Sequence, residues 1–202
     1  HVAINTSPTT SCGSLDSLDL ATHMSNQVDN RIAGKSPSTA FSTFSNRGTT
    51  IAGGNSYIRN TNVWTSAITP IDWTGISPYN SVSGPYNTGT LISPRHVIFA
   101  KHYYAPVGSN MVFVDNNNNI YERTLTNVMA VPGAMDIEIG ILDSDVPDSI
   151  TYYPIMASST LYTLLNQVNQ QALNVPIVIF DAEKKALIRS LNSLGTAQSP
   201  TV

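Results

Sequence analysis

Short β-like runs, each bounded by turn-forming residues, limit what this chain can fold into more than any other feature. From about residue 56 onward, apolar and β-branched residues gather in brief runs, and Gly, Pro and Asn separate one run from the next. Many short strands with few helical patterns predict an all-β barrel or sandwich. The clearest runs are residues 88–92, 111–114, 120–128, 137–142, 150–155 and 175–180.

Two further segments extend this pattern. Asp115 and the four asparagines at 116–119 lie between two alternating runs. Asn and Asp tolerate left-handed backbone angles, so this segment predicts the loop of a β-hairpin. Residues 183–191 could form a strand or a helical turn, and we expect a strand.

Residues 1–50 differ from the rest of the chain. They are rich in Ser and Thr and show little apolar periodicity, which predicts an extended arm with a short helix within residues 15–24. Charged residues make up 11% of the whole chain, against about 25% in an average soluble domain. A surface solvated by hydroxyl and amide groups favours a secreted or cell-surface protein. Cys12 is the only cysteine, so no intrachain disulfide can form.

Charge and motif content exclude several classes of function. The formal net charge is −3 and there is no run of Lys or Arg, so nucleic acid is not an expected partner. No stretch approaches 18 uninterrupted apolar residues, and no membrane span is expected. Asp143, Asp145 and Asp148 lack the spacing of a calcium loop and indicate a solvated acidic loop. We therefore expect neither a metal nor a cofactor.

One segment carries a recognisable motif. Residues 89–103 read Gly-Thr-Leu-Ile-Ser-Pro-Arg-His-Val-Ile-Phe-Ala-Lys-His-Tyr. This order resembles the strand-then-histidine segment of the trypsin-like serine peptidase family. The resemblance implies that His102, and not His96, is the catalytic histidine, presented by a short helical turn after a buried strand that ends at Ser93. Tyr103 stands where many members of the family have a cysteine.

A second segment follows in the order that the resemblance requires. Residues 135–142 read Met-Asp-Ile-Glu-Ile-Gly-Ile-Leu and resemble the family's aspartate-bearing strand, so Asp136 is the expected partner of His102. A carboxylate entering an apolar strand needs a partner to offset its desolvation, and a histidine Nδ1–H supplies one. The alternatives are a structural histidine at 102 and a strand-entry turn residue at 136.

The third element of the family pattern is missing. The resemblance calls for a Gly-Asp-Ser-Gly turn that carries the nucleophile, and no such turn occurs. Ser190, Ser193 and Ser199 are not flanked by glycines in that way. We expect the encoded protein to continue past Val202, and residues 1–202 alone to be inactive. The predicted parts are an arm (1–50), a trypsin-like Greek-key first β-barrel with His102 and Asp136 (51–165), and the start of an incomplete second barrel (166–202).

Two functions from different classes remain open at this point. The first is a secreted trypsin-like serine endopeptidase that acts on polypeptides without a cofactor. The second is a non-catalytic extracellular structural or adhesive protein built on the same barrel. An incomplete second barrel would leave apolar surface and strand edges, which favours association with a C-terminal fragment or self-assembly.

Overall fold

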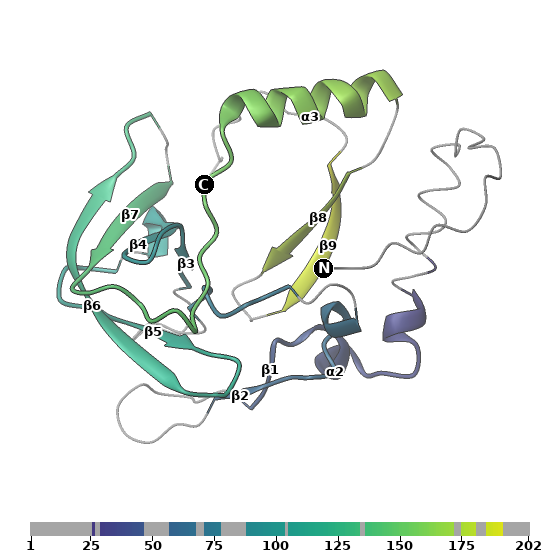
Figure 1. The fold of residues 1–202 in the computed structure, drawn as a ribbon, viewed down its shortest axis with the longest axis horizontal. Helices are drawn as coiled ribbons and strands as arrows, with labels where there is room; N and C mark the ends of the chain where they lie inside the picture. The colour runs from purple at the N-terminus through teal and green to yellow at the C-terminus, as the bar shows by residue number, and fades with distance from the viewer. Residues whose placement is uncertain are drawn as a thin grey trace.

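The computed structural model describes residues 26, 29–46, 57–67, 71–77, 88–103, 105–133, 136–171, 175–180 and 185–191. Within them the protein is mostly β, with few helices and one curled sheet that forms half of a barrel (Figure 1). The sheet is antiparallel throughout and its strand order is β3-β4-β7-β6-β5. Its strands are β3 (Thr90–Leu91), β4 (His96–Ala100), β5 (Asn110–Val114), β6 (Ile120–Ala130) and β7 (Ile137–Leu142).

The long strand β6 gives the sheet its curl. Its first half pairs with β5 and its second half pairs with β7, and the register shifts between Leu125 and Asn127. A β-bulge of this kind bends a strand and increases its twist. β6 therefore turns from one pairing partner to the other, as its arc in Figure 1 shows.

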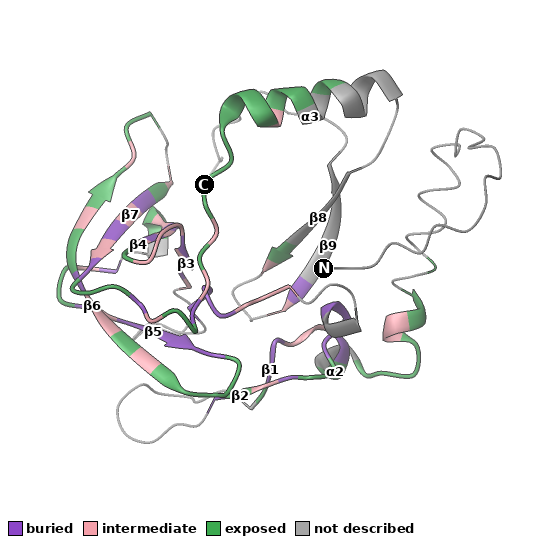
Figure 2. Ribbon diagram, viewed as in Figure 1, coloured by how far each residue is buried: buried purple, intermediate pink, exposed green. Residues whose placement is uncertain are grey.

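The concave side of this sheet holds the main core. Along β7 the residues alternate between partly exposed and buried, as expected for a strand with one face toward a core. Figure 2 shows buried residues concentrated on β5, β4 and β7. The cluster consists of Leu91, Val97, Phe99, Ala105, Met111, Phe113, Leu125, Leu142, Val146 and Ile150.

The predicted asparagine-rich hairpin loop is confirmed between β5 and β6. Asp115 is buried, and its Oδ1 accepts the main-chain N–H groups of Asn117 and Asn119, each at 2.8 Å. Its Oδ2 accepts the amide of Asn119 at 2.9 Å and the hydroxyl of Tyr121 at 3.2 Å. Asn118 has φ 67°, a left-handed conformation that Asn tolerates better than most residues. The buried carboxylate thus organises the whole loop.

A second group of elements lies beside the sheet. β1 (Phe44–Asn46) pairs with β2 (Ile58–Arg59), and β8 (Val175–Phe180) pairs with β9 (Ala186–Leu191). The short helices are α2 (Pro37–Phe41) and the 3₁₀ turn η1 (Trp64–Ala67), and the long helix is α3 (Ser158–Gln171). The indole of Trp64 donates to the carbonyl of Ala186 at 2.7 Å, so the N-terminal segment and β9 share a small core.

The structure confirms most of the predicted strands and corrects one. β3, β5, β6, β7, β8 and β9 lie in predicted runs, β4 was not predicted, and residues 150–155 do not form a strand. There the main-chain N–H of Tyr153 donates to the carbonyl of Leu91, and that of Thr151 donates to the hydroxyl of Thr74. The segment is therefore held by single hydrogen bonds and does not pair as a strand. Helix α3 was not predicted. The helix expected within residues 15–24 lies outside the described residues.

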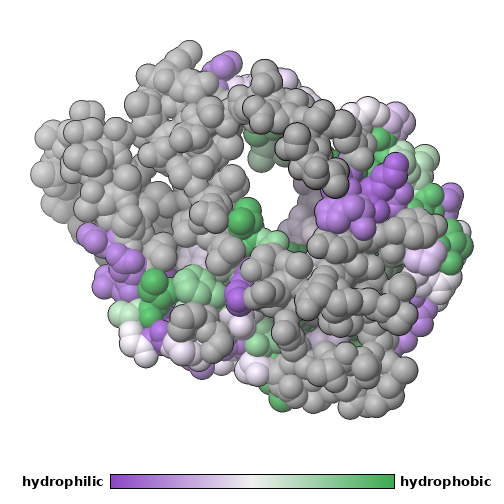
Figure 3. All heavy atoms as spheres, turned by 180° about the vertical axis from the view of Figure 1, so that it is seen from behind, coloured by the Kyte–Doolittle hydropathy of each residue, from purple (hydrophilic) through white to green (hydrophobic). Residues whose placement is uncertain are grey.

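The domain boundaries at 50/51 and 165/166 stay predictions. α2 and β1 lie within the range predicted as an arm, and α3 runs across the second boundary. On the face shown in Figure 3, the described residues are visible in several areas, and hydrophobic and hydrophilic residues occur together in them. Among the helices that the structure describes, none is long and apolar enough to cross a bilayer.

Candidate active site

Antiparallel pairing of β4 with β7 brings the two predicted site segments together. The last pair of the ladder joins Ala100 to Ile137. The residues that follow Ala100 must therefore lie beside the residue that precedes Ile137. The chain leaves β4 into the 3₁₀ turn η2 (Lys101–Tyr103), and the main-chain N–H of Lys101 donates to the carbonyl of Asp136 at 3.2 Å.

His102 and Asp136 contact each other through two hydrogen bonds. The main-chain N–H of His102 donates to Oδ1 of Asp136 at 2.8 Å. Nδ1 of the imidazole lies 2.5 Å from Oδ2 of the same carboxylate. The carboxylate therefore fixes both the turn that carries the histidine and the orientation of its ring.

This geometry also sets the proton positions. The main-chain N–H of His102, and then its side chain, hold the pKa of Asp136 below its ordinary value, so the carboxylate is ionised at neutral pH. An ionised carboxylate can only accept, so Nδ1 of His102 carries the shared proton. In the neutral ring Nε2 is then the acceptor, which is the tautomer of a general base.

The pair lies at the surface. The side chain of His102 is 58% exposed and that of Asp136 is 37% exposed. Solvent therefore reaches both side chains. Solvent at the same time screens the charge interaction between the two side chains.

The second histidine of the motif is held elsewhere. His96 opens β4, and its Nδ1 lies 2.7 Å from the hydroxyl of Ser93. The same hydroxyl oxygen accepts the main-chain N–H groups of Arg95 and His96. These bonds close the turn between β3 and β4. From the sequence we expected the helical turn to follow this turn directly. β4 lies between the two turns, so His96 and His102 lie at opposite ends of one strand.

The serines that the sequence offered lie in different places. Ser190 is in β9, opposite Pro176 of β8 in the ladder. Ser193 and Ser199 lie outside the described residues.

Sequence reasoning missed two features near the site. One is the main-chain bond from His102 to Asp136, which only the β4–β7 register reveals. The other is Glu138, a buried residue two positions beyond Asp136 whose Oε2 has no hydrogen-bond partner. In the alternating pattern of β7 a glutamate at an inward position was the available signal.

Neither a metal site nor a family assignment accompanies this pair. In the part of the chain that the structure describes, no three His, Cys, Asp or Glu side chains are grouped so as to hold a metal ion. The sequence matches no protein-family model and no curated protein. The geometry of His102 and Asp136 is therefore the ground for the function proposed next.

Proposed function

We propose that this chain supplies the general base and its orienting carboxylate to a secreted or cell-surface trypsin-like serine endopeptidase. His102 is the base, Asp136 orients it, and a polypeptide is the substrate. The observation that carries the proposal is the double contact in which Asp136 binds the main-chain N–H and Nδ1 of His102.

In this proposal each residue acts through a particular group. Nε2 of His102 takes the proton of a serine hydroxyl as its oxygen attacks the peptide carbonyl, and later gives that proton to the leaving amine. Asp136 stays ionised and stabilises the imidazolium formed between these two transfers. The sequence contains no Gly-x-Ser-Gly turn. In this proposal the serine therefore comes from another part of the native protein or from an associated chain.

The connectivity of the sheet supports the same proposal. β5, β6 and β7 follow one another as neighbours, while β4 lies beside β7 and not beside β5. Three consecutive antiparallel strands with a fourth returned to their far edge have the connectivity of a Greek key. Such a sheet, curled into half a barrel, is consistent with a trypsin-like first barrel.

Hydrolysis of a peptide substrate by the native protein tests this function. Asp136→Asn should lower kcat by on the order of 10⁴-fold, because the amide stabilises the wrong imidazole tautomer and no imidazolium. Asp143→Asn removes the same charge from an exposed loop beyond the other end of β7 and should leave kcat unchanged. Equal rates for the native protein and Asp136→Asn would contradict the proposed role of Asp136. A non-catalytic adhesive protein would then remain.

A further inference from the structure

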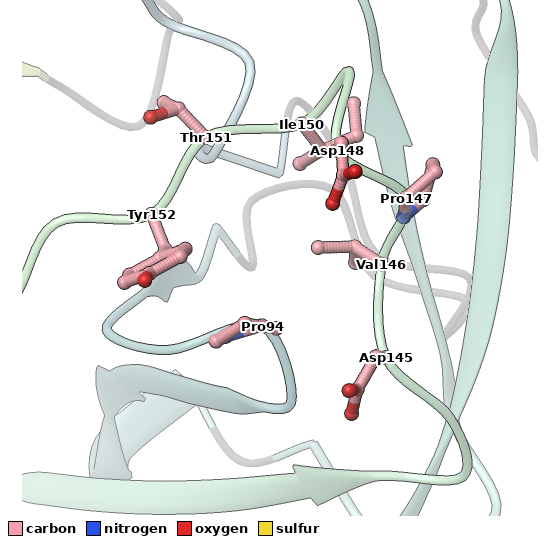
Figure 4. A pocket seen from close by; sticks show the side chains of 8 residues that line it. All are labelled: Pro94, Asp145, Val146, Pro147, Asp148, Ile150, Thr151 and Tyr152. Atoms are coloured by element: carbon pink, nitrogen blue, oxygen red, sulfur yellow. The ribbon is translucent and has the colours of Figure 1, made fainter.

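The pocket beyond the end of β7 does not gather its polar groups around one point. It lies between Pro94 and the segment 145–152. Figure 4 shows the carboxylates of Asp145 and Asp148 apart from each other, with the side chain of Val146 between them. Val146 belongs to the core cluster. A more specific surface for a partner is the outer edge of β9 in the second sheet.

β8 and β9 form a sheet of two strands, and their pairing indicates which main-chain groups point away from it (Figure 1). Antiparallel residue pairs alternate between pairs that exchange two hydrogen bonds and pairs that exchange none. Pro176 has no N–H and lies opposite Ser190, which fits a pair without hydrogen bonds. The carbonyl of Ala186 accepts the indole N–H of Trp64 at 2.7 Å, which fits a carbonyl that points away from β8. Both observations give the same alternation, in which the N–H and C=O groups of Ile188 and Ser190 point outward from β9.

The two outer edges of this sheet differ. On β8 one of the outward positions is Pro176, which offers no donor, and proline is a common means of protecting an edge strand. On β9 the start of the edge is covered by the bridge between Ser42 and Lys185. Beyond this bridge, no strand in the part of the chain that the structure describes pairs with Ile188 or Ser190. The edge of β9 is therefore open where that of β8 is protected.

We propose that the open edge of β9 pairs with the same edge of a second copy of this chain, about a two-fold axis. A two-fold axis makes the identical strands antiparallel, so each donor of one copy meets an acceptor of the other. A two-stranded sheet is at best marginally stable alone, and the paired sheet has four strands in the order β8-β9-β9-β8. Pro176 then lies on both outer edges. The assembly therefore closes as a dimer.

One register of this pairing is favoured. An axis at Ile188 would pair Ser190 with Ala186, whose carbonyl already accepts an indole N–H. An axis at Arg189 would place the two arginines opposite each other, and like charges directly opposite destabilise a sheet. An axis at Ser190 avoids both, because it places Arg189 opposite Leu191 of the second copy. The two Ser190 residues then exchange their main-chain hydrogen bonds.

Hydrogen exchange of the ¹⁵N-labelled protein at several concentrations tests the proposal. The amide of Ser190 points outward, so it should exchange rapidly in dilute protein and at least about tenfold more slowly when the dimer forms. The amide of Arg189 bonds to β8 within one copy and serves as the internal control, because it should already be protected in dilute protein. Sedimentation velocity should show a monomer–dimer equilibrium over the same concentrations.

Two variants at one position locate the contact. Ser190→Pro removes the outward N–H without removing a bond to β8, and it should weaken dimerisation by about 10- to 100-fold, the scale of two lost main-chain hydrogen bonds. Ser190→Ala keeps the N–H and should dimerise as the parent protein does. The exchange measurement needs no variant, so it stands even if Ser190→Pro does not fold.

Several results would overturn the proposal. The first is a protein that stays monomeric at every concentration. The second is protection of the Ser190 amide that does not depend on concentration, because the edge would then be covered within one copy. Equal dimerisation of Ser190→Pro and Ser190→Ala, or assembly beyond a dimer, would also contradict it.

Discussion

Asp136 binds His102 at two points, the main-chain N–H at 2.8 Å and Nδ1 at 2.5 Å. A side-chain contact alone would leave the histidine free to move with its turn. The main-chain bond ties the turn itself to the start of β7, next to the last residue pair of the β4–β7 ladder. The orientation of the imidazole is therefore a consequence of strand register.

The first prediction concerns the acid range. The folded-state pKa of Asp136 is lowered, first by the main-chain N–H of His102, from the ordinary value of 3.8. A group with a lowered folded-state pKa stabilises the fold above its unfolded pKa, and this contribution is lost as the pH falls through the folded-state pKa. Asp136→Asn should therefore be less stable than the parent protein above about pH 5, and the difference should narrow below pH 3.8.

Urea unfolding followed by circular dichroism at several pH values measures this difference. Because the side chain of Asp136 is 37% exposed, added salt should also reduce it. A difference in the free energy of unfolding that stays constant from neutral pH to below pH 3.8 would contradict the prediction.

The second prediction concerns the hairpin loop. Burial raises the pKa of Asp115, but hydrogen bonds from Asn119, Asn117 and Tyr121 lower it more, and the net direction is down. Asp115→Ala removes the shared acceptor of these donors and should lower the free energy of unfolding by about 2 kcal/mol, the scale of a hydrogen bond to a charged group.

The matched control for this variant is Asn117→Ala. Only the main-chain N–H of Asn117 contributes to the loop, so this change should cost less than about 0.5 kcal/mol in chemical denaturation. Equal losses for the two variants would show that the carboxylate does not organise the loop.

The third prediction concerns the packing at Gly140 of β7. A Cβ added at Gly140 would lie 2.5 Å from Cδ2 of Leu125 and 3.0 Å from Cε1 of Phe99. Gly140→Ala should therefore cost about 1–3 kcal/mol by overpacking the core. Asn127→Ala, an exposed position on β6, should stay within about 0.5 kcal/mol. Thermal unfolding of both variants measures the loss of stability. An unchanged midpoint for Gly140→Ala would show that the core accommodates the added methyl group, which would contradict the prediction.

Local pattern was enough for part of this fold. Alternation predicted β7 from Ile137 to Leu142, and the run of asparagines after Asp115 predicted the hairpin loop. Local pattern failed for residues 150–155, which are rich in β-forming residues but make single hydrogen bonds to Thr74 and to Leu91 of β3 instead of a ladder. It also failed for α3, because a helix without charges gives a weak amphipathic signal beside strong strand signals.

The contact between the Asp136 carboxylate and Nδ1 of His102 was expected from the sequence, but the main-chain bond between the two residues was not. The order of the two motifs pointed to His102 and Asp136. Their contact depends on the pairing of β4 with β7, a long-range register that no single segment encodes. In the same ladder Glu138 pairs with Phe99 and is buried.

Labelling of the native protein, purified from its source, with a fluorophosphonate probe tests the central claim most directly, because the probe reacts with a serine that a histidine base activates. We predict one labelled serine per molecule in the native protein, and loss of that labelling in His102→Ala. Residues 1–202 alone, which contain no Gly-x-Ser-Gly turn, should not be labelled stoichiometrically. Absence of labelling in the native protein, or full labelling in His102→Ala, would contradict the assignment of His102 as the base.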